Sequence, residues 1–275
     1  MAAREFLVAY SMLVDSHCHL NYPEFADIRA VIARAQVAGV LRMLTIATQQ
    51  ADFAAVRALA ATHPEIYASI GVHPHEAEPH ADISEAELLA EASHPRVIGI
   101  GETGLDYYYE HSPRAAQQAL FRRHIRVART LDLPVIVHSR AADDDTIAIL
   151  QEMHAEGAFR FLIHCFSSGA SLSEEAVKLG GYISASGIIT FKKSAELREH
   201  FSRVPLERLL VETDAPYLAP EPHRGKPCEP AFTALTAQKL AEIKSVSFEQ
   251  LARATTDNFY RLFSKAGEGA TPHTP

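Results

Sequence analysis

Short apolar runs recur along this chain and alternate with segments whose apolar residues follow the helical period of about 3.6 residues. The runs predict β-strands over residues 12–15, 42–48, 66–72, 97–102, 134–138, 159–164, 182–186 and 209–214. Helices are predicted over 28–39, 51–62, 84–92, 113–131, 146–156, 172–179, 194–201, 231–243, 248–254 and 257–263. In the longest helix we expect Ser112 as the N-cap and Pro113 at the first helical position.

The predicted strands are continuously apolar, which is typical of parallel strands buried on both faces. Eight strand–helix units in 275 residues match a single-domain (β/α)8 TIM barrel. An open doubly wound α/β sheet is the alternative, but the chain has neither a Gly-x-Gly-x-x-Gly fingerprint nor a P-loop motif. We expect the barrel over residues 12–265, an N-terminal extension over 1–11 and a flexible tail over 266–275.

Composition places the chain among ordinary globular proteins, with 47% hydrophobic and 22% charged residues. Three cysteines provide no disulfide framework and fit a reducing cytoplasm. No apolar stretch approaches the roughly 18 residues of a membrane span, and the first residues lack the apolar core of a signal peptide. A net charge of −8 argues against broad adhesion to duplex DNA or anionic membranes. It does not exclude a phosphate-bearing substrate, because bound cations supply positive charge locally.

Side chains that bind metals follow the predicted strands at their carboxyl ends. His17 and His19 are one residue apart, so an extended backbone directs both imidazoles to one face and Cys18 to the other. The full set of such residues is His17, His19, Glu102, His138, His164 and Asp214. Because the carboxyl ends of barrel strands meet on one face, we expect these side chains to form one cluster of N and O ligands, suited to Zn²⁺, Mn²⁺ or Mg²⁺.

Each of these residues also has an ordinary structural explanation when it is taken alone. His138 fits a hydrogen-bonded core histidine, Glu102 the partner of an arginine, and Asp214 the cap of a turn. Six such residues at strand ends favour a shared site. Because six ligands exceed what one catalytic metal takes from a protein, we expect two divalent cations. Glu102 would bridge them, and Asp214 would also accept the proton of an attacking water.

These residues, in this order, resemble the TatD-type family of metal-dependent deoxyribonucleases, within the amidohydrolase-like barrels. The matching motifs are Val14-Asp15-Ser16-His17-Cys18-His19-Leu20, Gly71-Val72-His73-Pro74-His75, Ile100-Gly101-Glu102-Thr103-Gly104-Leu105-Asp106, Pro134-Val135-Ile136-Val137-His138-Ser139-Arg140, Ile163-His164-Cys165-Phe166-Ser167-Ser168-Gly169 and Val211-Glu212-Thr213-Asp214-Ala215-Pro216-Tyr217-Leu218. They span about residues 12–264.

The resemblance implies a TIM barrel that holds two divalent metal ions. One ion would be held by His17, His19, Glu102 and Asp214, and the other by Glu102, His138 and His164. It also implies hydrolysis of phosphodiester bonds in DNA with 3′→5′ exonuclease action, for which we expect single-stranded or frayed 3′ ends as partners.

Residues outside the ligand set have weaker assignments. Arg224 and Lys226 suit phosphate, beside Cys228 where the family usually has Asn, although a solvated loop explains them equally well. His73 is a candidate phosphate contact, and His75 fits a turn as well as a substrate contact. Tyr107, Tyr108 and Tyr109 fit loop packing, with stacking on a base as an alternative, and Cys165 is expected to face away from the ligands as a packing residue.

Two other functions remain open from the sequence. An amidohydrolase-like enzyme would cleave a small amide, ester or phosphoester, but such enzymes often bridge their metals with a carboxylated lysine, and no predicted strand ends in lysine. A non-catalytic barrel that binds metal or a partner would not need the acid/base candidate Asp214.

Overall fold

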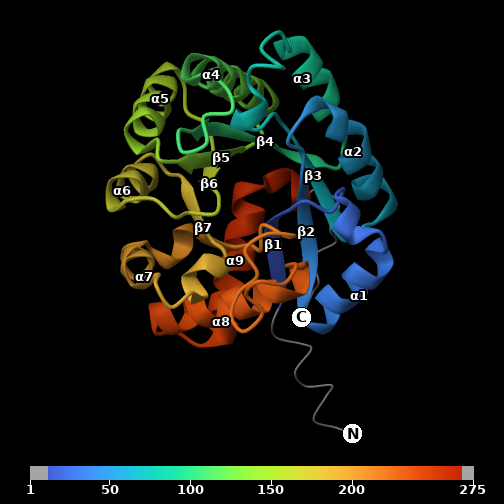
Figure 1. Ribbon diagram of the computed structural model, residues 1–275, viewed down its shortest axis with the longest axis vertical. Coiled ribbons are helices and arrows are strands. Elements are labelled where there is room, and N and C mark those ends of the chain that lie inside the picture. The colour runs from blue at the N-terminus through green and yellow to red at the C-terminus, as the bar shows by residue number, and fades with distance from the viewer. Residues whose placement is uncertain (1–11, 268–275) are drawn as a thin grey trace, which may run out of the picture.

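The computed structural model describes residues 12–267, which form a closed barrel of parallel strands with helices outside it (Figure 1). The strands in this range are β1 (Leu13–Cys18), β2 (Val40–Ile46), β3 (Ile66–Ile70), β4 (Val97–Asp106), β5 (Val135–Arg140), β6 (Phe161–Ile163), β7 (Tyr182–Ala185) and β8 (Leu209–Val211). Each strand pairs in parallel with the next along the chain. The predicted TIM barrel is therefore confirmed.

The barrel closes between β8 and β1 through residues that follow the short β8. The amide of His19 donates to the carbonyl of Ala215 at 2.8 Å, and the amide of Asp214 donates to the carbonyl of His17 at 2.9 Å. An isolated parallel bridge joins Cys18 and Ala215. Closure of the barrel therefore places Asp214 beside the two histidines of β1.

The helices of the described range surround the barrel. They are α1 (Ile28–Val37), α2 (Phe53–Thr62), α3 (Glu85–Ala92), α4 (Arg114–Leu131), α5 (Asp143–Glu156), α6 (Ala170–Lys178), α7 (Ala195–Arg203), α8 (Thr233–Lys244) and α9 (Phe248–Leu262). Between residues 12 and 267, no helix is both long and apolar enough to cross a membrane.

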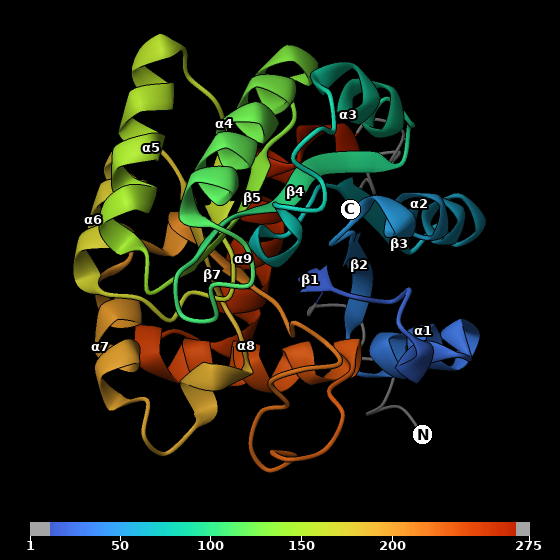
Figure 2. The same ribbon diagram turned by 45° about the horizontal axis from the view of Figure 1, so that its top comes forward.

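Two apolar cores hold these layers together. The larger core lies between the strands and the outer helices and contains residues such as Met43, Val97 and Leu240. The smaller core joins inner strand residues such as Leu44 to Phe259 and Phe263 near the end of α9. Figure 2 shows α9 at the centre of the ring of outer helices. The interior of the barrel is therefore filled at one end, and the site is confined to the other.

The structure corrects several predicted boundaries. Strand β4 runs on through Glu102 to Asp106, whereas β8 ends three residues before Asp214. The two helices predicted over 248–254 and 257–263 are one helix, α9. The Thr255 hydroxyl donates to the carbonyl of Leu251 at 3.0 Å within that helix, so its polar group does not interrupt it.

The start of α4 also differs from the prediction. Pro113 is the N-cap and the helix begins at Arg114. The Ser112 hydroxyl instead donates to the carbonyl of His75 at 2.7 Å and accepts from the amide of Glu78 at 3.0 Å. Ser112 thus ties the start of α4 to the loop after β3.

The predicted extension and most of the predicted tail lie outside the described residues, at 1–11 and 268–275. Ala266, near the start of the predicted tail, is 4% exposed, and its carbonyl accepts a hydrogen bond from the Tyr67 hydroxyl at 2.9 Å. Packing against the barrel therefore continues to the end of the described chain.

Candidate metal centre

The ligands predicted from the sequence converge at the carboxyl ends of the strands. A cavity of about 730 Å³ opens there and is lined by His19, His73, Glu102, His138, His164 and Asp214, among other residues. His17 is fully buried, yet its Nε2 lies 3.6 Å from Oδ1 of Asp214. The structure thus brings all six predicted residues into one cluster.

A register shift in β1 sets the direction of the two histidines. Val14 packs in the inner core, so strict alternation would also turn Cys18 inward. The pairing with β2 is irregular between Asp15 and Cys18, as at a β-bulge, which re-aims side chains. His17 and His19 consequently point to the cluster of candidate ligands, and Cys18 packs in the outer core. The predicted direction of all three side chains is confirmed.

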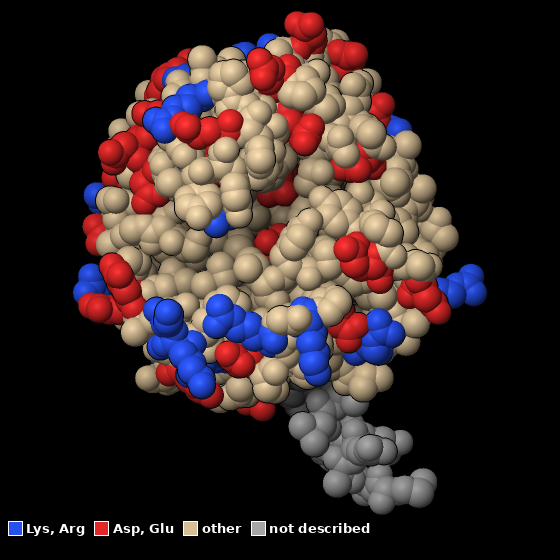
Figure 3. Space-filling model, in the orientation of Figure 1, with Lys and Arg blue, Asp and Glu red and all other residues tan. Residues whose placement is uncertain are grey.

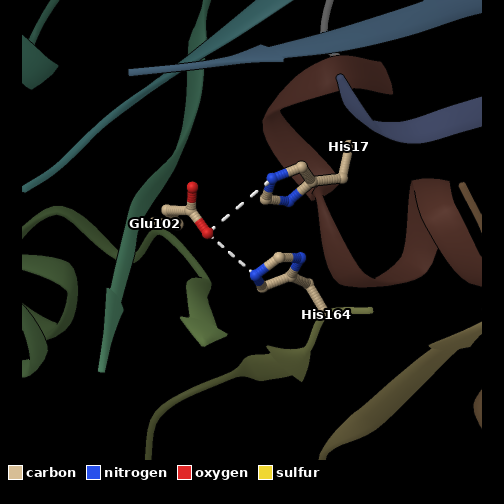
Figure 4. A group of neighbouring side chains, drawn as sticks. All are labelled: His17, Glu102 and His164. Atoms are coloured by element: carbon tan, nitrogen blue, oxygen red, sulfur yellow. Dashed lines mark ion pairs between the residues drawn. The ribbon is translucent and has the colours of Figure 1, made fainter. Parts of the chain in front are cut away.

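Glu102 lies at the centre of the cluster. Its Oε2 is 2.8 Å from Nε2 of His164 and 3.9 Å from Nε2 of His17, two contacts that Figure 4 shows. The same oxygen is 3.7 Å from Nδ1 of His138. The second oxygen, Oε1, is 3.8 Å from Nε2 of His19. One carboxylate therefore contacts imidazoles from β1 and from the β5 and β6 ends, with Oε2 shared by His17, His138 and His164 and Oε1 facing His19.

Three overlapping groups of ligand atoms each lie within 4.8 Å of one another: His17 with Glu102 and His164, His17 with His19 and Asp214, and His73 with Glu102 and His138. Asp214 contributes Oδ1, which is 3.4 Å from Nε2 of His19. His73, which the sequence suggested as a phosphate contact, lies with its Nε2 4.0 Å from Oε2 of Glu102. It therefore belongs to the ligand cluster by position.

The chemical state of the cluster fits divalent cations. Neither ring nitrogen of His17 has a hydrogen-bond partner, although the residue is fully buried. Burial and the neighbouring His164 hold the pKa of His17 well below its usual value, so the ring is neutral and its nitrogen lone pair is available. Burial opposes the charge of Glu102, but the adjacent His73 and His164 imidazoles hold its pKa well below its usual value. Burial opposes a charge on His164, but Glu102 holds the pKa of that imidazole well above its usual value, so a bound cation would take the place of a proton there. Imidazoles beside a carboxylate are the donor set of Zn²⁺ and related cations.

Two buried carboxylates behind the cluster have no counterpart in the sequence-based site. Oδ2 of Asp106 lies 3.2 Å from Nε2 of His138 and 2.9 Å from Nε2 of His75. Oε1 of Glu212 lies 3.5 Å from Nδ1 of His164. Asp106 follows Glu102, and Glu212 precedes Asp214, in each case at an even spacing. Residues at even spacing point to the same face of a strand, so this spacing was the signal available in the sequence for a carboxylate beside the ligands.

The peripheral predictions have mixed outcomes. Cys165 lines the cavity with the ligands, so the expectation that it faces away is wrong. Strand β6 ends at Ile163, and Cys165 has a left-handed φ of 44°, so strand alternation does not extend to it. The Tyr107 hydroxyl donates to Asp145 at 2.7 Å, in agreement with loop packing. Arg224 and Lys226 are exposed and, among the described residues, are not part of the cavity lining.

Comparisons with known proteins agree with this geometry. Residues 14–264 match the family model described as TatD related DNase. The uncharacterized metal-dependent hydrolase YcfH of Escherichia coli K12 is 43% identical over 91% of this chain and 95% of its own. The uncharacterized metal-dependent hydrolase YabD of Bacillus subtilis is 38% identical over 92% of this chain and 99% of its own.

A solved structure supports the same assignment. The crystal structure of YjjV, a TatD homolog from Escherichia coli K12, superposes with a TM-score of 0.86 at 33% identity, covering 92% of this chain and 98% of that one. The buried histidine, glutamate and aspartate clusters described above suit the metal ions that such hydrolases require. This chain belongs to the TatD related DNase family of metal-dependent hydrolases, within the amidohydrolase-like TIM barrels.

Proposed function

We propose that this protein is a metal-dependent deoxyribonuclease that removes nucleotides from 3′ ends of DNA in the 3′→5′ direction. The observation that carries the proposal is the position of Glu102, whose two carboxylate oxygens face different histidines of one buried cluster. A shared carboxylate of this kind suits two adjacent cations, the arrangement used in many phosphodiester hydrolases. The family description, TatD related DNase, supports DNA as the substrate.

In this proposal six side chains hold two divalent cations of Zn²⁺, Mn²⁺ or Mg²⁺ type. His17, His19 and Asp214 hold one, His138 and His164 hold the other, and Glu102 is shared. Bound cations supply Lewis-acid stabilisation of the phosphoryl oxygens and make water a better nucleophile. His73 is close enough to Glu102 to contact either the second cation or a phosphate oxygen.

Asp214 is the proposed proton acceptor. Its side chain is 16% exposed and lines the cavity, whereas the side chain of Glu102 is 4% exposed. Asp214 therefore reaches a water in the cavity more readily than Glu102 does. Its Oδ1 lies within 3.6 Å of Nε2 of both His17 and His19, which hold it at the cavity wall. From there it would take the proton of the attacking water.

The burial of the cluster favours unpaired ends as substrates. His17 is fully buried, and Glu102 and His164 are 3% and 5% exposed, so a phosphate must enter the cavity to reach them. A base-paired nucleotide inside a duplex does not fit such an approach without separation from its partner strand. Tyr217 at the cavity wall is 51% exposed and offers a ring on which an unpaired base can stack.

Two further observations bear on the alternatives. Among the residues described, no lysine lines this cavity, which disfavours the carboxylated-lysine branch of the amidohydrolase-like enzymes. The three cysteines are all free, which is consistent with the reducing cytoplasm that we propose as the location of the protein.

The test is release of mononucleotides from end-labelled single-stranded DNA. The purified protein is incubated with Mg²⁺, Mn²⁺ or Zn²⁺, alongside Glu102→Gln and Asp214→Asn variants, with a blocked 3′ end as a substrate control. We expect stepwise shortening from the 3′ end by the wild type only, and losses of at least 100-fold in both variants. Turnover of a small amide or ester without nucleotide release would overturn the proposal.

A further inference from the structure

Two loops at the mouth of the barrel carry four exposed cations. Lys192 and Lys193 follow the short helix η4 (Gly187–Thr190), and Arg224 and Lys226 lie between β8 and α8. Within the described chain, none of the four has a carboxylate partner within 4.0 Å. Several other exposed cations do have such a partner, for example Arg126 with Glu85 at 2.6 Å. We call these four residues the cation band.

The two loops are packed together, so the cation band is continuous. The Arg224 guanidinium lies over the ring of Phe191, 4.4 Å from its centroid. Phe191 directly precedes Lys192 in the sequence. The amide of Glu221 donates to the Thr190 hydroxyl at 2.9 Å. Gly187 approaches the second loop so closely that an added Cβ would lie 2.1 Å from the carbonyl oxygen of Leu218. Figure 3 shows basic side chains gathered along one edge of the central hollow.

The cation band borders the metal cavity without entering it. Ile188 and Leu218, one from each loop, line the cavity, as does Tyr217. None of the four cations lines it among the described residues, so they do not reach a phosphate held at the metal cluster. Tyr217 directly precedes Leu218 in the second loop, and its ring lies 6.3 Å from that of Tyr22, another residue of the cavity wall. A substrate that leaves the cavity on this side passes from Tyr217 to the cation band.

We propose that the cation band binds phosphates of a single DNA strand several nucleotides away from the bond that is cut, with Tyr217 stacking on a base between the two sites. This inference rests on the proposed function and extends it to an outer binding site. Exposed cations next to an exposed aromatic ring are the recurring elements of single-strand binding surfaces. On a chain with a net charge of −8, an unpaired basic band also directs a polyanion to one side of the cavity.

The test measures binding separately from cleavage. Full-length protein in EDTA is titrated into a fluorescein-labelled single-stranded dT 20-mer at several NaCl concentrations. Four phosphate contacts predict a slope of log affinity against log salt of about −3, because each single-strand contact contributes about −0.7. We expect the Lys192→Ala/Lys193→Ala variant to have a slope of about −1.5 and an affinity roughly tenfold or more lower at 0.1 M NaCl.

The matched control removes the same charge elsewhere. The Lys178→Ala/Arg253→Ala variant changes two exposed cations on α6 and α9 and should leave both slope and affinity unchanged. A second readout is hydrolysis of bis(p-nitrophenyl) phosphate with metal present, which needs only the cavity and should be equal in all three proteins. A Tyr217→Ala variant should lose affinity without a change in salt slope.

The outcomes separate the band from the proposed function. The cation band is not a single-strand site if the two double variants lose the same affinity for the dT 20-mer. The same conclusion follows if the wild type binds a blunt duplex 20-mer as tightly as the single strand. Unchanged binding by the Lys192→Ala/Lys193→Ala variant, with DNA still cleaved, would reject the band and leave the nuclease intact. Loss of binding in that variant, with no DNA cleaved by the wild type, would support the band and reject the nuclease.

Discussion

Asp106 holds the ring of His138 from behind, with its Oδ2 3.2 Å from Nε2, while Nδ1 of the same ring faces Glu102 at 3.7 Å. This relationship decides which nitrogen of His138 is available to a metal. Burial opposes the charge of Asp106, but hydrogen bonds from His138 and His75 hold its pKa well below the usual range of a carboxyl group. A carboxylate behind a ligating imidazole fixes its tautomer and raises its basicity.

Substitution of Asp106 by Asn should weaken metal binding without removing a ligand. The amide retains an oxygen for the backbone N–H groups of Tyr108 and Tyr109, which donate to Oδ1 at 3.0 Å, but it loses the charge at the His138 contact. We expect a loss of roughly 10- to 100-fold in affinity for one of two metal ions, measured by titration calorimetry. Asp144→Asn, an exposed carboxylate on α5, is the matched control and should bind as the wild type does. Unchanged affinities in Asp106→Asn would contradict this role.

Gly104 allows β4 and β5 to approach closely between Glu102 and Asp106. Its φ is 133°, and an added Cβ would lie 2.1 Å from the carbonyl oxygen of His138. Gly104→Ala should therefore displace β5 at a cost of about 3 kcal/mol or more, which lowers the melting temperature by roughly 6 °C or more. Gly180→Ala is the control, because Gly180 has a φ of 83° but no atom within 4 Å of the added Cβ. Gly180→Ala should lower the free energy of unfolding by about 1 kcal/mol. Equal melting temperatures of the Gly104→Ala and Gly180→Ala variants would argue against the close approach of β4 and β5 at Gly104.

His124 supports the loop that carries His73. The amide of Val72 donates to Nε2 of this buried ring at 3.1 Å, and Nδ1 donates to the carbonyl of Leu120 at 2.8 Å. The contact with Val72 requires a neutral imidazole, because Nε2 accepts that hydrogen bond with its lone pair, whereas the bond to Leu120 suits either charge state. Burial, which outweighs the bond to Leu120, lowers the pKa of His124 from 6.5 to about 4.

This shift predicts a stability that depends on pH. Because the folded-state pKa lies below the unfolded value, the unfolded chain binds more protons between pH 6.5 and 4, and stability is lost as the pH falls through that window. The contribution is about 3 kcal/mol, which corresponds to roughly 6–12 °C in melting temperature. The metal-free wild type should lose that much more than His124→Gln between pH 7 and pH 4 in thermal scans. Parallel curves for the two proteins would contradict the assignment.

The fold was predictable because the pattern of apolar residues that specifies each strand is contained in a short stretch of sequence. Continuous apolar runs identify buried parallel strands, and their number and spacing identify the barrel. The predicted ends of β4 and β8 were wrong because hydrophobicity does not report where pairing stops. Glu102 lies inside a strand that continues to Asp106, and Asp214 follows a strand that ends at Val211. The ligands converge regardless, since both segments lie at the same end of the barrel.

The parts of the site that escaped prediction depend on contacts across the sheet. The link from Asp106 to His138 joins β4 to β5, and the link from Glu212 to His164 joins the β8 and β6 ends. The even spacing along each strand indicates that Asp106 and Glu212 lie on the ligand side, but it does not report which imidazole each of them contacts. Cys165 was misplaced because a two-residue period was extended past the end of β6. His17 and His19 were predicted correctly to share a face, because two residues at this spacing still point to one side although the pairing between Asp15 and Cys18 is irregular.

We propose that Glu102 is shared by two cations at this site. The most direct measurement is anomalous diffraction from crystals of the protein grown with Mn²⁺, recorded on both sides of the manganese absorption edge. We expect two anomalous peaks about 3.5–4 Å apart, one beside His19 and Asp214, the other beside His138 and His164, with Glu102 between them. A single peak, or peaks away from Glu102, would contradict it.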